Sequence, residues 1–96
     1  MSTLHTLNKA PSAQLLASCI KTLQKGDAII FIEDGVYHVL EAALLESIPP
    51  KVGVYGLRED ISARGLADKC EESIEVVGYR SFVELCVEHD KIVSWF

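Results

Sequence analysis

The sequence predicts a three-layer, doubly wound α/β domain with a mainly parallel sheet of four to five strands and helices on both faces. Apolar runs rich in β-branched residues alternate with longer segments of helical period, the pattern of β-α-β units. The clearest strand, residues 27–32, is a continuous apolar run of the kind that is buried on both faces of a parallel sheet. The 96 residues are expected to form one domain, because so short a chain cannot build two separate cores.

Ahead of that clearest strand, the pattern predicts a short strand over residues 4–7 and then a helix. Ser12 is expected to cap the helix over residues 12–24, in which apolar side chains fall on one stripe. Gly26 is expected to end it, since glycine accepts the left-handed conformation found just past a helix.

The middle of the chain predicts a second helix, a third strand and a short helix. Asp34 is expected to cap a helix over residues 35–47, which the following pair of prolines prevents from continuing. The third strand is expected over residues 51–55, and a short helix over residues 59–64 is expected to stop at Gly65.

The last third of the chain predicts one more strand, a helix and an end strand. Residues 66–73 are expected to form a loop or a short helical turn, followed by a strand over residues 74–77. Ser81 is expected to cap a helix that ends near His89, and residues 91–96 alternate weakly as a strand. The order of the strands in the sheet stays open.

The composition excludes several classes of protein. The net charge is −5 and the nine basic residues are scattered, which disfavours direct binding to nucleic acid. The sequence shows neither an apolar stretch long enough to span a bilayer nor a secretory leader, and three cysteines without metal-like spacing fit a reducing compartment. A cytoplasmic protein is therefore expected. The apolar content of 49% predicts either spare surface for a partner or a sheet that is simply covered on both faces.

Four blocks of the sequence, in this order and with this spacing, resemble the TusB/DsrH family over essentially the whole chain. They are residues 4–11 (LHTLNKAP), residues 31–37 (FIEDGVY), residues 55–66 (YGLREDISARGL) and the ending with Trp95. The Asp-Ile-x-Ala-Arg-Gly segment within the third block is the most distinctive.

The resemblance implies a flavodoxin-like fold and a small subunit of a TusBCD or DsrEFH sulfur-relay complex. Its partners would be TusC/DsrF-like and TusD/DsrE-like siblings in a cytoplasmic hetero-hexamer, with an indirect link to a TusE/DsrC-like sulfur acceptor. In the TusBCD form, persulfide sulfur is passed toward 2-thiolation of the wobble uridine of certain tRNAs. The DsrEFH form serves sulfur oxidation, and the sequence leaves both open. The main sulfur-carrying cysteine belongs to a larger sibling, so this chain would be an accessory, non-catalytic subunit.

The three cysteines differ in their fitness for sulfur transfer, which needs an accessible thiolate in an electropositive setting. Cys19 lies on the apolar stripe of the first predicted helix and is interpreted as a small buried hydrophobe, with a sulfur-binding thiol as the alternative. Cys86 is expected in the core. Cys70 lies beside two glutamates, which raise a thiol pKa, and is expected to be exposed and unreactive.

Other polar residues are candidates for a pocket or for an interface. His5 lies in the first strand and is either packed in the core or part of a pocket at the strand ends. Asn8 and Lys9 precede a predicted helix and leave open a module that binds a small anion. His38 and His89 lack partners at metal-ligand spacing, and no dinucleotide fingerprint is present, so neither a metal nor another cofactor is expected.

The remaining candidates are charged and aromatic residues that a subunit contact or a shared pocket would use. Asp60 and Arg64 are four residues apart on a predicted helix and are expected to pair, and the resemblance implies that their segment supports such a contact; a capped surface turn is the alternative. Asp34 is a further candidate. Trp95 and Phe96 are expected to pack on the chain's own helices or against a partner, because chain ends are seldom aromatic unless they are held.

Overall fold

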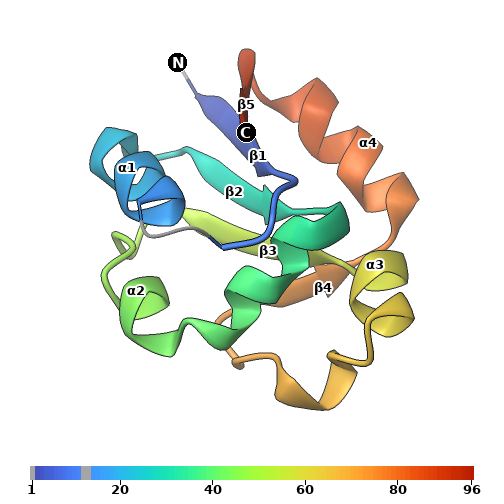
Figure 1. Cartoon of the computed structure of the whole chain (residues 1–96). Helices are drawn as coiled ribbons and strands as arrows, with labels where there is room; N and C mark the ends of the chain where they lie inside the picture. The colour runs from blue at the N-terminus through green and yellow to red at the C-terminus, as the bar shows by residue number, and fades with distance from the viewer. Residues whose placement is uncertain (1, 12–13) are drawn as a thin grey trace.

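Five parallel strands form one sheet, and its order explains how the helices divide between its two faces (Figure 1). The computed structural model describes residues 2–11 and 14–96. The strands lie in the order β4-β3-β2-β1-β5. Their bounds are Thr3–Leu7 for β1, Ala28–Phe31 for β2, Gly53–Leu57 for β3, Glu75–Val77 for β4 and Lys91–Trp95 for β5. The predicted parallel sheet is confirmed, and the order that the sequence left open is now defined.

The helices make two unequal layers on the sheet. They are α1 (Leu15–Thr22), the 3₁₀ helix η1 (Glu33–Leu40), α2 (Ala42–Glu46), α3 (Arg58–Ala63), the 3₁₀ turn η2 (Ala67–Lys69) and α4 (Tyr79–Glu88). The helices from α1 to α3 pack on one face, whereas α4 carries the chain from β4 at one edge to β5 at the other edge across the opposite face. The predicted three layers are therefore confirmed.

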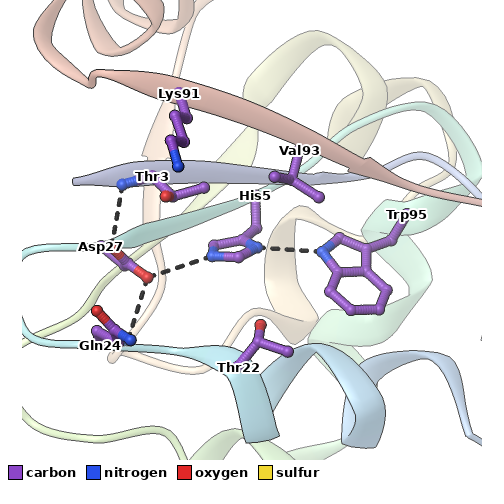
Figure 2. A pocket seen from close by; sticks show the side chains of 8 residues that line it. All are labelled: Thr3, His5, Thr22, Gln24, Asp27, Lys91, Val93 and Trp95. Carbon is purple, nitrogen blue, oxygen red and sulfur yellow. Dashed lines mark hydrogen bonds and ion pairs between the residues drawn. The ribbon is translucent and has the colours of Figure 1, made fainter. Parts of the chain in front are cut away.

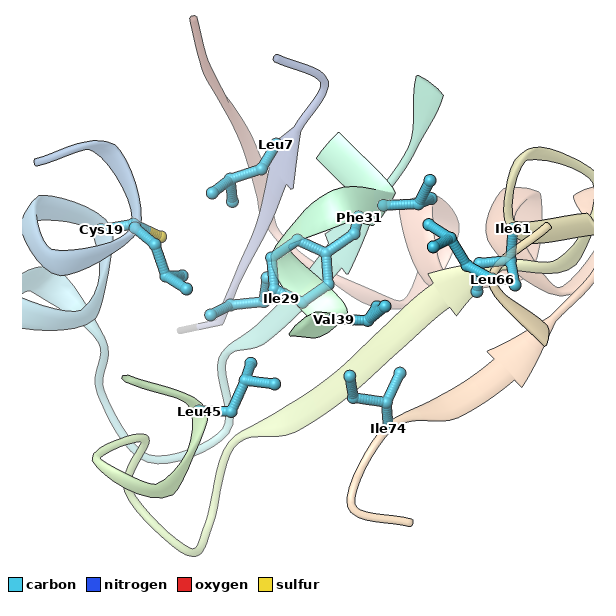
Figure 3. Packing of buried hydrophobic residues seen from close by; sticks show 11 residues of the cluster. Leu7, Cys19, Ile29, Phe31, Val39, Leu45, Ile61, Leu66 and Ile74 are labelled. Carbon is cyan, nitrogen blue, oxygen red and sulfur yellow. The ribbon is translucent and has the colours of Figure 1, made fainter. Parts of the chain in front are cut away.

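Two hydrophobic cores lie on the two faces of the sheet. The larger core joins side chains of β1 and β2, such as Leu7 and Phe31, to those of the helices from α1 to α3 (Figure 3). The smaller core joins Leu4 and Ile30 to Leu85 of α4. All four residues of β2 are buried, as predicted for a strand covered on both sides.

Several predicted helix boundaries were wrong. Ser12, the predicted cap of the first helix, lies outside the described residues. The helix α1 ends at Thr22 and is followed by Leu23 in an extended conformation, so Gly26, at φ +92°, belongs to the next turn and does not end the helix. This early end follows from a turn closed by a hydrogen bond from the Asp27 amide to the Gln24 carbonyl.

The caps predicted at Asp34 and Ser81 were wrong. Asp34 lies inside the first turn of η1, because the 3₁₀ helix already begins at Glu33. The helix predicted over residues 35–47 is split into η1 and α2, which are separated by Glu41. Ser81 lies inside α4, which begins after Gly78.

The third strand is displaced from its predicted position by two residues. A turn closed by the Val52 amide and the Pro49 carbonyl occupies the expected beginning of the strand, so β3 runs over Gly53–Leu57. The predicted short helix near residues 59–64 is confirmed as α3, and the end strand is confirmed as β5.

Gly35 is required by the close contact of η1 with the end of β1. A Cβ atom at this position would lie 1.8 Å from the carbonyl oxygen of Leu7, which also accepts the backbone hydrogen bond of Ile32. Because the atoms that the new Cβ would meet belong to the backbone of Leu7 and Asn8, no side-chain rotation can relieve the overlap.

We therefore predict that Gly35→Ala lowers the free energy of unfolding by more than about 3 kcal/mol, measured by urea denaturation. Gly65→Ala is the control. Gly65 has φ +68° but nothing within 4 Å of a new Cβ, so the loss should be only about 1 kcal/mol. Equal losses in the two variants would contradict the close contact.

Candidate functional site

A cavity of about 380 Å³ lies beside the amino-terminal half of β1 and along the length of β5 (Figure 2). Residues of three strand regions and of the end of α1 line it: Thr3, His5, Thr22, Gln24, Asp27, Lys91, Val93 and Trp95. Alternate residues of a strand point to the same face, and His5 pairs with Val93 in the β1–β5 register. Alternation along β5 therefore directs three of its side chains, those of Lys91, Val93 and Trp95, toward the cavity.

Asp27 is the buried charge of this cavity, and hydrogen bonds hold both of its carboxylate oxygens. Oδ1 accepts a bond from the Thr3 amide at 3.0 Å, and Oδ2 accepts one from the Gln24 amide at 3.1 Å. The ring nitrogen Nε2 of His5 lies 3.3 Å from Oδ2. Burial acts to raise the pKa of Asp27, but these hydrogen bonds outweigh it and leave the pKa below its ordinary value.

His5 connects Asp27 to the last residue of β5. The indole nitrogen Nε1 of Trp95 donates a hydrogen bond to Nδ1 of His5 at 3.1 Å, across 90 positions of sequence. An indole N–H can only donate, so Nδ1 must accept. Nε2 therefore carries the proton and donates it to Asp27. The sequence singled out His5 and Trp95 separately, and the structure brings them together through this bond.

Cys19 is a residue of α1, and its side chain is fully buried in the larger core. Burial, with a smaller contribution from the negative charge of Asp27, raises the pKa of its thiol to about 12. His5 has no free ring nitrogen that could take the proton, because Asp27 and Trp95 occupy both. The arrangement therefore keeps Cys19 as a neutral thiol at physiological pH.

The other two cysteines are half-buried. Cys70 donates a weak hydrogen bond from its thiol to the Leu66 carbonyl, and burial raises its pKa. Cys86 packs against the smaller core under α4. The expectation of an exposed Cys70 was wrong, since the turn η2 folds it back toward the larger core.

A second polar cluster joins η1 to α3 near the carboxyl ends of the strands. Arg64 donates to Oδ1 of Asp34 from Nε at 3.1 Å and from Nη2 at 2.9 Å, and its Nη1 lies 3.6 Å from Oδ1 of Asp60. The other carboxylate oxygen of Asp60 accepts the Glu33 amide at 2.7 Å. The hydrogen bond and charge of Asp34, with the charge of Asp60, raise the pKa of Arg64. The predicted pair of Asp60 and Arg64 is present, and Asp34 completes it.

The remaining candidates do not join either group. Asn8 and Lys9 follow the carboxyl end of β1 and do not line the cavity, and Lys9 is exposed. Phe96 follows β5 and is 84% exposed. His38 is fully buried, stacks on Phe31 and lies 2.7 Å from Glu41, measured from Nδ1 to Oε1.

Sequence reasoning missed Asp27. Its only sequence signal is an acidic residue placed between a glycine turn and the longest apolar run, where a solvent-exposed charge would have been expected. Within residues 2–11 and 14–96, the structure shows neither a cluster of three or more metal-ligating side chains nor a helix long and apolar enough to cross a bilayer.

The parallel strands and the helices on both faces define a doubly wound, all-parallel α/β domain. Solved structures that share this fold include the following two. The ychN protein of E. coli superposes with a TM-score of 0.77 at 15% identity, covering 98% of this chain and 99% of that chain. A Thermotoga maritima protein solved by NMR superposes with a TM-score of 0.68 at 21% identity, covering 90% and 92%. These likenesses concern the fold alone.

The chain belongs to the DsrH-like family, whose model matches residues 9–92. Proteins named TusB are among its relatives. The TusB of Pectobacterium carotovorum is 37% identical over 97 residues, and that of Enterobacter sp. is 36% identical over 96 residues. In both comparisons the match covers 96% of this chain and 99% of the relative. The family resemblance seen in the sequence is thereby confirmed.

We predict that Asp27→Asn lowers the free energy of unfolding at neutral pH by about 3 kcal/mol, because an amide cannot accept all the bonds that the carboxylate accepts. In the folded chain the pKa of Asp27 lies below its ordinary value of 3.8, so its charge stabilises the folded state at any pH above 3.8. This contribution is lost as the pH falls below 3.8. Urea denaturation at a series of pH values from neutral to acid should therefore show a smaller decrease in the free energy of unfolding for the variant than for the native chain. An unchanged acid dependence would contradict the assignment.

We also predict that iodoacetamide at about pH 8 modifies Cys70 and Cys86 before Cys19, because a buried neutral thiol is neither accessible nor nucleophilic. Peptide mass spectrometry after a timed reaction gives the order. Adding urea should remove the difference, which controls for the reactivity of the peptide itself. Early labelling of Cys19 in the folded chain would show that its site opens readily.

Proposed function

We propose that the chain is a non-catalytic subunit of a cytoplasmic sulfur-relay complex that passes persulfide sulfur toward 2-thiolation of the tRNA wobble uridine. The observation that carries the proposal is membership of the DsrH-like family over nearly the whole chain, with relatives named TusB. The burial of Cys19 and its raised pKa support a role without a reactive thiol.

The outer surface of α4 supports a role in assembly. Tyr79, Val83 and Val87 recur every four residues, so they form one stripe along the helix, and they are 55%, 61% and 80% exposed. Leu85 occupies the opposite side of α4 and packs on the sheet. A helix that is apolar on two sides has more apolar surface than its own domain can bury.

The edge strand β5 adds apolar surface on the same side of the sheet. Ile92 pairs with Leu4, whose side chain belongs to the core under α4, so Ile92 points to that face as well. It is half exposed. All-parallel sheets are normally covered on both faces, so exposed apolar residues at this edge fit a surface that a neighbouring subunit covers.

In this proposal the neighbours are TusC/DsrF-like and TusD/DsrE-like siblings in a hetero-hexamer, and a TusE/DsrC-like protein accepts the sulfur. A sibling supplies the sulfur-carrying cysteine. This chain supplies surface, with the stripe of Tyr79, Val83 and Val87 as the first candidate for a contact. The tRNA itself is not expected to touch this acidic chain.

The alternative is a DsrH-type subunit of a sulfur-oxidising complex in which Cys19 itself binds sulfur. Such a role needs α1 to move far enough to admit a persulfide, because Cys19 is fully buried. The relatives named TusB favour the tRNA branch.

We predict that the purified chain, mixed with its TusC-like and TusD-like siblings, elutes as one larger species in size-exclusion chromatography. Val83→Lys should weaken this assembly, because a charge would have to be buried in an apolar contact. Glu84→Lys is the matched control, since the neighbouring residue is exposed but lies off the stripe. Separate elution of the native chains would contradict the proposed function, and equal effects of the two variants would remove α4 from the contact.

A further inference from the structure

The hydrogen bonds through His5 run in one direction only. Trp95 donates to Nδ1 of His5, and Nε2 of His5 donates to Asp27. The chain of bonds therefore requires a neutral imidazole with its proton on Nε2. We propose that His5 is a proton-sensitive latch on the last strand: it holds Trp95 when the ring is neutral and releases it when the ring is charged.

Protonation removes the lone pair that the indole needs. A charged imidazole carries a hydrogen on both ring nitrogens, so Nδ1–H would face the Trp95 N–H at 3.1 Å, donor against donor. Turning the ring over would remove the Nε2–H donor from the Asp27 carboxylate. The bond to Asp27 becomes a charge-assisted bond between opposite charges, which is stronger than the neutral bond to the indole. The indole is therefore the partner that leaves.

The charged and titratable groups around His5 come from each element packed on it. Asp27, which precedes β2, carries a negative charge and lies 3.3 Å from Nε2. Lys91 of β5 carries a positive charge and lines the same cavity. Cys19 of α1 is neutral, since its pKa is about 12, and contributes no charge. Of these charged groups only the Asp27 carboxylate contacts the ring directly, so the ion pair with Asp27 decides which bond survives.

Within the described residues, two side-chain hydrogen bonds tie the carboxyl half of β5 to β1, and one is that of Trp95, which also packs against the larger core. The other is that of Ser94, whose hydroxyl lies 3.0 Å from the hydroxyl of Thr6. Phe96 follows directly and is exposed, so nothing beyond Trp95 holds the end of the strand within the part of the chain that the structure describes. Trp95 is also a wall of the 380 Å³ cavity. Release of the indole consequently loosens the end of an edge strand and opens the cavity together.

The native chain tests the latch directly by NMR on a sample labelled with nitrogen-15. Trp95 is the only tryptophan, so its indole N–H gives a single resonance. At neutral pH the nitrogen shifts of His5 should report a proton on Nε2. As the pH falls and those shifts report the imidazolium, the indole resonance should move with the same midpoint. Because β5 is an edge strand, only one of the consecutive amides of Ser94 and Trp95 faces β1. That amide should then exchange with solvent about fivefold faster, as expected for the loss of one bond worth roughly 1 kcal/mol.

A pair of variants separates the latch from general acid effects. In His5→Gln, the side-chain amide can accept a hydrogen bond from Trp95 and donate one to Asp27, but it cannot become charged. The indole resonance should therefore stay fixed over the pH range in which His5 of the native chain becomes charged. His89→Gln removes a histidine whose ring lies 2.7 Å from the Leu85 carbonyl, away from the cavity, and should leave the titration intact.

Three outcomes would overturn the proposal. They are a proton on Nδ1 of His5 at neutral pH, an indole resonance that stays fixed while His5 becomes charged, and a titration in His5→Gln equal to that of the native chain. If His5→Gln does not fold, the native titration alone still decides, because it compares the two midpoints within one sample.

Discussion

The buried carboxylate of Asp27 is the interaction on which this end of the molecule depends. A charged group with 5% of its surface exposed is stable only if its oxygens are hydrogen-bonded, and here three donors come from two separate parts of the chain. The Thr3 amide belongs to the beginning of β1, the Gln24 amide to the turn after α1, and the imidazole of His5 to the middle of β1. Through His5 the same carboxylate reaches Trp95 at the end of β5. The side chain of Asp27 thus bonds to the turn that follows α1 and, through His5, to the edge strand.

The same arrangement limits what the cysteines can do. A sulfur carrier needs a thiolate, and a thiolate needs either positive charge or a base nearby. Around Cys19 the structure places apolar side chains and a negative charge, and the imidazole bound to that same carboxylate has both nitrogens engaged. This is the chemistry expected of a subunit that contributes surface to a relay. In the proposed function, the exposed stripe on α4 and the exposed Ile92 of β5 would supply that surface.

The layers and strands were predictable because their signals are local. A continuous apolar run gave β2, and alternating helical segments gave the parallel sheet. The caps predicted at Asp34 and Ser81 were wrong because each residue is a good cap by type but lies past the start of its helix. The helix η1 begins where it packs against the end of β1, and α4 begins directly after Gly78. The two-residue displacement of β3 has a local cause, because a turn with Pro50 at its second position occupies the predicted beginning of the strand.

The candidate site was only partly predictable, because its bonds join residues far apart in the sequence. His5 and Trp95 could each be singled out as unusual, but a contact across 90 positions depends on β5 returning to lie beside β1, and strand order was open. Asp27 could not be singled out, since an acidic residue before a strand is ordinarily solvated. The pairing of Asp60 with Arg64 was predictable because it needs only helical spacing, whereas the part of Asp34 in it needs the packing of η1 against α3.

In the proposed function, this chain serves a sulfur relay through its surface, while its thiols carry no sulfur. The most direct measurement is intact-mass spectrometry of every subunit after the assembled complex has been exposed to a persulfide donor. The account predicts an added sulfur atom on a sibling subunit and none on this chain. An added sulfur atom on Cys19 of this chain, at a level comparable to the sibling's, would contradict it.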